Sequence, residues 1–157
     1  MPMTPTRIKR NRMDSTKRFA LAVQYACSEK SVPSRAQVRR WIVASAQRAM
    51  QITVRFVANA EARALNREFR GKDYPTNVLT FVYDEATLQG DIAICVGVIK
   101  KEAKEQKKTI HAHFAHMVIH GALHLQGYDH EKKKDAVVME SREIALLRRF
   151  KIANPYE

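Results

Sequence analysis

The chain has 157 residues, 45% of them apolar and 28% charged, a balance that excludes a disordered or fibrous protein and predicts a globular one. Its 28 lysines and arginines outnumber 16 acidic residues, and the formal net charge of +12 favours polyanionic partners such as nucleic acids. The apolar runs are far shorter than the roughly 20 residues that cross a bilayer, so we expect no membrane span.

Residues 1–18 differ in composition from the rest of the chain. They hold six basic residues, one acidic residue and two prolines without an apolar period, and so predict a flexible basic arm. Residues 19–157 are expected to form a single domain. Within it, Cys27 and Cys95 are lone thiols without a paired spacing, which suits a reducing compartment. We therefore expect a cytoplasmic protein.

Segments that predict strands and helices alternate in the front half of the domain. Alternating apolar residues predict a strand, whereas a capping residue followed by apolar residues three or four positions apart predicts a helix. By these criteria we expect strands over residues 18–27, 52–56, 78–83 and 91–96, and helices from Ser34 to Met50 and over residues 60–69. Asn59 is expected to cap the second helix and Gly71 to end it.

The back half of the chain is helical by the same criteria. We expect helices over residues 97–106, from a Thr109 cap to about Gln126, and over residues 133–149. Strands that come first and helices that follow are typical of an α+β fold. The sequence therefore predicts a small mixed four-stranded sheet packed with about five helices.

All six histidines fall within residues 111–130, a concentration that the composition does not explain. His120 and His124 lie four residues apart on the expected helix, so both side chains project from one face, about 6 Å apart along the axis. This spacing lets two imidazoles share one metal ion. His116 extends the same row, but on a straight helix it lies about 12 Å from His124, so a third ligand must come from elsewhere.

Gly127 offers a route to that third ligand, because a glycine can end the helix in the left-handed conformation and bring His130 back toward the pair. The string HGALHLQGYDH, residues 120–130, matches the metzincin pattern H-E-x-x-H-x-x-G-x-x-H in its histidines and glycine. Gly121, however, stands where those zinc peptidases place their general-base glutamate, which disfavours peptidase activity. The expected ligands on this zincin-like central helix and its loop are His120, His124 and His130.

Three imidazoles leave a tetrahedral ion with one open position, which is the pattern of catalytic rather than structural sites. Zinc suits three histidines best, although nickel, copper and iron bind such sets too. Two alternatives remain open at this point. One is a set of ordinary core or surface histidines, and the other is a closed structural site completed by a cysteine or Asp129.

Three segments occur together in this chain: HGALHLQGYDH at residues 120–130, FRGKDYPTNVLTF at residues 69–81 and GDIAIC at residues 90–95. In these segments the chain closely resembles the YbeY family of bacterial and organellar endoribonucleases specific for single-stranded RNA. The likeness runs from about Phe19 to the C-terminus. The resemblance implies a role in maturation of the 16S ribosomal RNA 3′ end and in ribosome quality control, with the small ribosomal subunit as a partner.

The resemblance also implies a zinc ion on the three histidines of the string and a catalytic arginine at Arg70. An arginine that precedes Gly71 can project from a helix end into a cleft, where its guanidinium can clamp a phosphate through two hydrogen bonds. Arg67 and Lys72 lie close enough in the sequence to widen a basic groove that binds the phosphates of the RNA.

The sequence thus predicts a metal-dependent endoribonuclease. The bound ion would lower the pKa of its water and would share with Arg70 the charge that develops on the phosphate. No protein base is evident, and either water or the ribose 2′-OH can be the attacking group. The alternatives are a ribosome-associated RNA-binding protein with a structural metal, and a zinc hydrolase of small substrates, for which a charge of +12 is more than the substrate needs.

Overall fold

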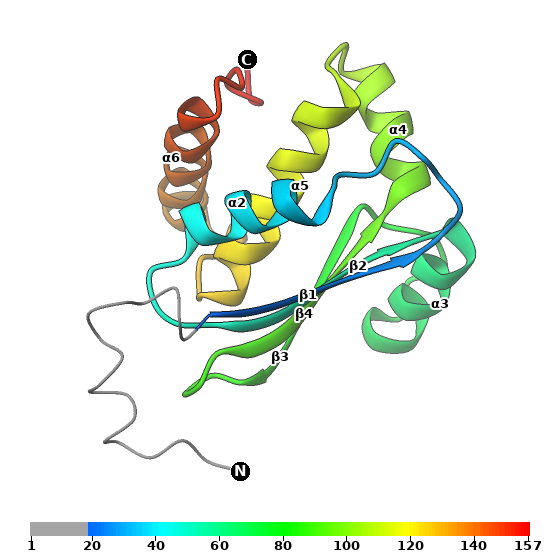
Figure 1. Cartoon of the computed structure of the whole chain (residues 1–157), viewed down its shortest axis with the longest axis horizontal. Helices are drawn as coiled ribbons and strands as arrows, with labels where there is room; N and C mark the ends of the chain where they lie inside the picture. Colours follow the sequence, from blue (N-terminus) through cyan, green and yellow to red (C-terminus); the bar gives the residue numbers. More distant parts are fainter. Residues whose placement is uncertain (1–18) are drawn as a thin grey trace.

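A computed structural model describes residues 19–157 as a four-stranded sheet flanked by helices (Figure 1). The predicted basic arm, residues 1–18, lies outside the described residues. The strands are β1 (Ala20–Ala26), β2 (Gln51–Val57), β3 (Val78–Asp84) and β4 (Gln89–Cys95). They lie in the order β1-β2-β4-β3, with β1 parallel to β2, β2 parallel to β4 and β3 antiparallel to β4. The predicted mixed sheet is therefore confirmed, and β3 forms one of its edges.

Five helices lie within the described residues: α2 (Arg35–Ser45), α3 (Asn59–Arg70), α4 (Val96–Glu105), α5 (Ile110–Leu125) and α6 (Lys133–Arg149). Figure 1 shows α2, α5 and α6 on one side of the sheet and α3 on the other. This arrangement is the α+β fold that the sequence predicts. None of the helices in this part of the chain is long and apolar enough to cross a membrane.

The main core lies between the sheet and α5. Val54 and Phe56 of β2 are fully buried, whereas Thr53 and Arg55 alternate with them and are only half-buried, which explains the alternating pattern of the strand. Helix α5 is buried along most of its length and is therefore the central helix of the fold. Trp41 of α2 is also buried and belongs to the same core.

Helix α5 packs on β4 so closely that only glycine fits at one position of the helix. A Cβ atom added to Gly121 would lie 2.9 Å from Cγ2 of Ile92, closer than real carbon contacts. Gly121 is the position at which zinc peptidases carry their general-base glutamate. A side chain at this position would require Ile92 to shift, so the packing of α5 on the sheet disfavours the glutamate.

Helix α2 is shorter than the sequence predicts, because it ends at Ser45 instead of Met50. Gln126, at the end of α5, binds the chain at this point. Its Nε2 donates to the carbonyl of Ser45 at 2.9 Å, and its Oε1 accepts from the N–H of Gln47 at 2.8 Å. These contacts join residues 81 and 79 positions apart, so no local pattern indicates them.

The prediction that Asn59 caps α3 is wrong. The N-cap is Ala58, without a side-chain hydrogen bond, and Oδ1 of Asn59 instead lies 3.1 Å from Sγ of Cys95. The side chain of Asn59 therefore connects α3 to the end of β4. Two other predicted helix boundaries are confirmed: Gly71 ends α3 in the left-handed conformation with a φ of 70°, and the Thr109 side chain caps α5.

Replacing Gly121 by valine is expected to lower the free energy of unfolding by about 1–3 kcal/mol, because the added methyl groups force α5 away from Ile92. Urea unfolding followed by circular dichroism measures this change. Ile92→Ala leaves a cavity and is destabilising by itself, but it makes room for the valine. The double variant should therefore lose less stability than the sum of the two single losses, and strict additivity would contradict the proposed contact.

Candidate metal centre

The end of α5 and the loop behind it bring the histidines into one place. The N–H of Gly127 donates to the carbonyl of His124 at 3.1 Å, and the N–H of Tyr128 donates to the carbonyl of Leu123 at 3.2 Å. Gly127 has a φ of 102°, in a region that glycine adopts without strain. The predicted reversal of the chain at Gly127 is therefore confirmed, and the loop carries His130 back toward α5.

The rings of His120, His124 and His130 lie near one another. The ring centres of His120 and His130 are 5.2 Å apart, those of His124 and His130 are 5.9 Å apart, and those of His120 and His124 are 6.3 Å apart. Three imidazoles that bind one tetrahedral zinc ion at about 2.0–2.1 Å have ring centres roughly 5 Å apart. One pair of rings thus has the spacing that a shared ion requires, and the other two pairs are somewhat farther apart.

Hydrogen bonds determine which nitrogen carries the proton in two of these rings. Nδ1 of His120 lies 2.6 Å from Oε2 of Glu143, and Nδ1 of His124 lies 2.8 Å from the backbone carbonyl oxygen of Tyr128. A carboxylate and a carbonyl only accept, so each Nδ1 carries a proton and donates it. In the neutral ring, Nε2 then has a free lone pair, and this is the form of histidine that binds a metal ion.

Glu143 of α6 is fully buried and yet ionised. Its carboxylate accepts hydrogen bonds from Nε2 of His116 at 2.8 Å, from Nδ1 of His120 at 2.6 Å and from the hydroxyl of Tyr156. Burial by itself raises the pKa of Glu143, but the hydrogen bonds from His116 and His120 outweigh it and lower the pKa to about 2. Glu143 is therefore an anion that connects α6 to the histidines of α5.

A second group of possible ligands shares His120 with the first. The ligand atoms of His116, His120 and Glu143 all lie within 4.8 Å of one another, so this group could also hold a metal ion. Each histidine in it already uses one ring nitrogen to donate to Glu143, and Nδ1 of His116 is buried without a partner among residues 19–157. An ion in this group would have to replace the protons that now join the three side chains.

The histidines face a cleft of about 610 Å³. Its lining also includes residues of α3, of β3 and the segment before it, of the loop after α5 and of the C-terminal segment, among them Arg70, Asn77, Thr80, Asp129, Glu131 and Tyr156. Arg70 reaches the cleft because α3 ends directly after it, where the N–H of Gly71 donates to the carbonyl of Arg67 at 3.1 Å. A guanidinium and the imidazoles therefore line the same space.

The family model for the endoribonuclease YbeY matches residues 23–151. The chain belongs to the YbeY family. Its relatives include the endoribonuclease YbeY of Thiobacillus denitrificans, which is 54% identical over 139 residues that cover 87% of this chain and 95% of the relative. The endoribonuclease YbeY of Nitrosomonas europaea is 44% identical over 157 residues, which cover 99% of this chain and 94% of the relative.

A solved structure shares the fold of this YbeY family member. The solution structure of a Thermotoga maritima protein is 25% identical in sequence and aligns with a TM-score of 0.55, over 86% of this chain and 95% of that one. The family resemblance seen in the three sequence segments is therefore confirmed.

The other two predicted substrate-binding residues are not part of the cleft lining. Arg67 is exposed, and its Nη1 lies 3.5 Å from Oδ1 of Asp73, a carboxylate that Arg63 also holds through hydrogen bonds of 2.8 and 3.0 Å. Lys72 is exposed just beyond the end of α3. The structure thus places Arg70 in the lining of the histidine cleft and leaves Arg67 and Lys72 outside that lining.

Sequence reasoning missed Glu143 and Tyr156. Glu143 lies among the buried residues of α6, with Met139 four positions before it and Leu146 and Leu147 three and four positions after it. A carboxylate on an otherwise apolar helix face is a signal that could have identified Glu143. Tyr156 lies beyond the last helix, and no local pattern indicated its role.

A second carboxylate connects the start of β3 to α4 and α5. Glu102 accepts hydrogen bonds from Nδ2 of Asn77 at 3.2 Å and from Nε2 of His113 at 2.8 Å. Burial lowers the pKa of His113, although the hydrogen bond to Glu102 acts in the opposite direction. Neutral His113 therefore supports one wall of the cleft.

Acidification is expected to destabilise the metal-free protein through His113. The unfolded chain takes up the proton with the ordinary pKa of 6.5, whereas folded His113 resists it, so stabilisation present above pH 6.5 is lost as the pH falls below that value. With a chelator present, the thermal midpoint should fall less between about pH 7.5 and about pH 5 in the His113→Gln variant than in the unmodified protein. The glutamine keeps a hydrogen-bond donor but does not titrate. Equal pH dependence of the two proteins would contradict this expectation.

Proposed function

We propose that this chain is a zinc-dependent endoribonuclease that cleaves single-stranded RNA, with its ion held by His120, His124 and His130. The observation that carries the proposal is the convergence of the three rings in a cleft that Arg70 also lines. Membership of the YbeY endoribonuclease family supports the RNA-cleaving activity.

The three side chains fit zinc by donor type as well as by position. Neutral imidazoles are preferred zinc ligands, and three of them leave one coordination position for water or substrate. A bound zinc ion would lower the pKa of a coordinated water and polarise a phosphate oxygen. The hydrogen bonds that Nδ1 of His120 and of His124 donate keep both rings in the tautomer that zinc binding requires.

Arg70 would bind the scissile phosphate. A guanidinium can donate two parallel hydrogen bonds to phosphate oxygens, and it keeps its charge throughout the physiological pH range. Negative charge grows on those oxygens as the phosphodiester is attacked, so Arg70 would stabilise the transition state more strongly than the bound substrate. In support of this role, Arg70 lies in the last turn of α3, directly before Gly71, and lines the cleft that the histidines face.

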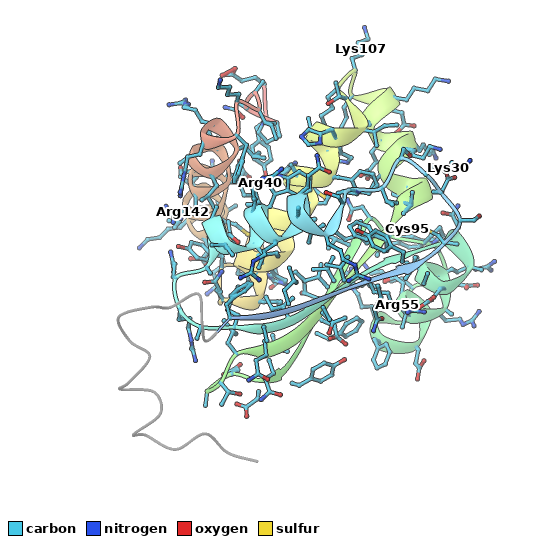
Figure 2. All side chains as sticks on the ribbon, in the orientation of Figure 1. Lys30, Arg40, Arg55, Cys95, Lys107 and Arg142 are labelled. Atoms are coloured by element: carbon cyan, nitrogen blue, oxygen red, sulfur yellow. The ribbon has the colours of Figure 1, made fainter. Side chains whose placement is uncertain are left out.

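The cleft and the surface favour an unpaired RNA strand. A volume of about 610 Å³ suits roughly one or two nucleotides and is too small for a duplex. Arg67 and Lys72 on the adjoining surface would bind flanking phosphates without regard to base sequence. The net charge of +12 also attracts a polyanion at long range, whereas Lys30 and Lys107 extend outward from other parts of the fold (Figure 2).

We also infer from the family resemblance a role in the cytoplasm at the small ribosomal subunit, in maturation of the 16S ribosomal RNA 3′ end and in ribosome quality control. The ends of the cleaved RNA distinguish the two possible attacking groups. A cyclic phosphate indicates attack by the ribose 2′-OH, whereas a 5′-phosphate indicates attack by water.

One observation favours a second candidate function. The buried group of His116, His120 and Glu143 could hold a structural ion. The chain would then be a ribosome-associated RNA-binding protein in which the metal only stabilises the fold. Removal of the ion would in that case lower the thermal midpoint, and binding of RNA would not lead to cleavage.

Replacing His124 or His130 by alanine should abolish zinc binding and slow the cleavage of single-stranded RNA at least about 100-fold, because each variant loses one of three ligands. Elemental analysis and cleavage of a labelled strand measure the two effects, while the thermal midpoint of the metal-free protein should change little. His111→Ala is the matched control, since His111 is an exposed histidine of the same helix. Zinc retained in the first two variants but lost in His116→Ala would assign the ion to the buried group.

Arg70→Ala should lower kcat for RNA cleavage by about 100- to 1,000-fold with little change in zinc content, because transition-state charge loses its partner. Arg67→Ala and Lys72→Ala should instead weaken RNA binding. Each should also lower the slope of the logarithm of the RNA-binding constant against the logarithm of the salt concentration by about one. Single-turnover kinetics and filter binding at several salt concentrations separate these effects, with Lys30→Ala as a distant control. An unchanged kcat in the Arg70 variant would exclude Arg70 from the reaction.

A further inference from the structure

The C-terminal segment of the chain reaches the candidate metal centre through Glu143. We propose that Glu143 and Tyr156 are positioning residues: Tyr156 holds Glu143, and Glu143 holds His120 in the orientation and tautomer that bind the ion. The inference rests on the proposed function, because it takes His120 as a ligand of the catalytic ion. It adds to that function a role for the last residues of the chain.

The carboxylate of Glu143 is held at one oxygen and accepts from His120 at the other. Oε1 accepts hydrogen bonds from Nε2 of His116 at 2.8 Å and from the hydroxyl of Tyr156. Oε2 is thereby directed at Nδ1 of His120, at a distance of 2.6 Å. Glu143 is 0% exposed, so these three donors replace the water that an exposed carboxylate would bind.

Glu143 decides which nitrogen of His120 carries the proton. An ionised carboxylate cannot donate, so the proton lies on Nδ1 and the lone pair of Nε2 is available to the ion shared with His124 and His130. Without this acceptor the ring could rotate or take the other tautomer, in which Nε2 is protonated and cannot bind metal. Loss of such a partner of a ligating histidine typically weakens metal affinity by about 10–100-fold.

Tyr156 is held in place by the turns that follow α6. The N–H of Ile152 donates to the carbonyl of Leu147 at 3.0 Å, and the N–H of Tyr156 donates to Oδ1 of Asn154 at 2.8 Å. The Tyr156 ring meets the His116 ring edge-on, with ring centres 5.4 Å apart and an interplanar angle of 84°. Tyr156 therefore supports both the carboxylate and the second histidine that holds it.

The exposure of Tyr156 argues against a role in core packing alone. The residue is 46% exposed, and yet its hydroxyl reaches a fully buried carboxylate. Tyr156 also lines the cleft that the histidines face. One side chain near the C-terminus thus forms part of the substrate site and supports a proposed metal ligand.

The test measures the zinc affinity of the full chain by competition with a chromophoric chelator. Glu143→Gln keeps the size of the side chain but replaces one acceptor oxygen by an NH₂ group, so zinc binding should weaken about 10–100-fold. Tyr156→Phe removes only the hydroxyl and should weaken binding by about 2–10-fold. Because Tyr156 acts through Glu143, the double variant should bind zinc no more weakly than Glu143→Gln alone.

Two further measurements separate positioning from stability. Tyr83→Phe is the matched control, because Tyr83 also donates its hydroxyl to a carboxylate, that of Asp91 at 2.5 Å, but lines a different pocket together with residues of α3. It should leave zinc affinity unchanged. Imidazole nitrogen shifts measured by NMR on the metal-free protein should show the proton of His120 on Nδ1. In the Glu143→Gln variant, a larger fraction of the molecules should carry this proton on Nε2. A merely structural role of Glu143 would not move this proton.

Unchanged zinc affinity in a folded Tyr156→Phe variant would overturn the role of Tyr156, and an unchanged His120 tautomer in Glu143→Gln would overturn that of Glu143. If Glu143→Gln does not fold, the affinity of Tyr156→Phe decides the question alone. Failure of the proposed function gives a different result, in which zinc binding survives both His124→Ala and His130→Ala. Failure of the positioning role alone leaves those two variants without zinc.

Discussion

Helix α5 lies on β4 with a glycine on each side of the contact, and this close packing sets the position of each proposed ligand that the helix carries. Gly121 of the helix faces Ile92, and a Cβ atom added to Gly90 of the strand would lie 2.6 Å from the carbonyl oxygen of Phe81 and 3.0 Å from Leu125. Neither element can shift toward the other without a clash, and any gap would cost apolar burial. The last turns of α5 therefore stay beside the start of β3, and the cleft between them keeps its shape.

An ionised glutamate in a protein core destabilises the fold unless its charge is matched, and three donors match the charge of Glu143. The resulting network joins α5, α6 and the C-terminal segment. Apolar packing alone has little direction, whereas hydrogen bonds to a carboxylate have a defined distance and angle. The buried charge can therefore orient the ring of His120, which a leucine at the same position could not do.

The cleft combines groups from separate parts of the chain, and its local charge differs from that of the whole protein. Arg70 comes from the end of α3, while Asp129 and Glu131 come from the loop that carries His130. The N–H groups of His130 and Glu131 lower the pKa of Asp129, so the acid is ionised. The net charge of +12 attracts RNA at long range, but among the side chains that line the cleft Arg70 supplies the positive charge for a phosphate.

Local patterns in the sequence predict the order of strands and helices, the histidine row and the reversal at Gly127, because apolar period, helix caps and left-handed glycines act over a few residues. The end of α2, the basic residue near the end of α3 that lines the cleft, and the partners of the proposed ligands instead depend on contacts between distant elements. Gln126 meets Ser45 across 81 positions and Glu143 meets His120 across 23. Such partners depend on how whole elements pack, and no short segment encodes that.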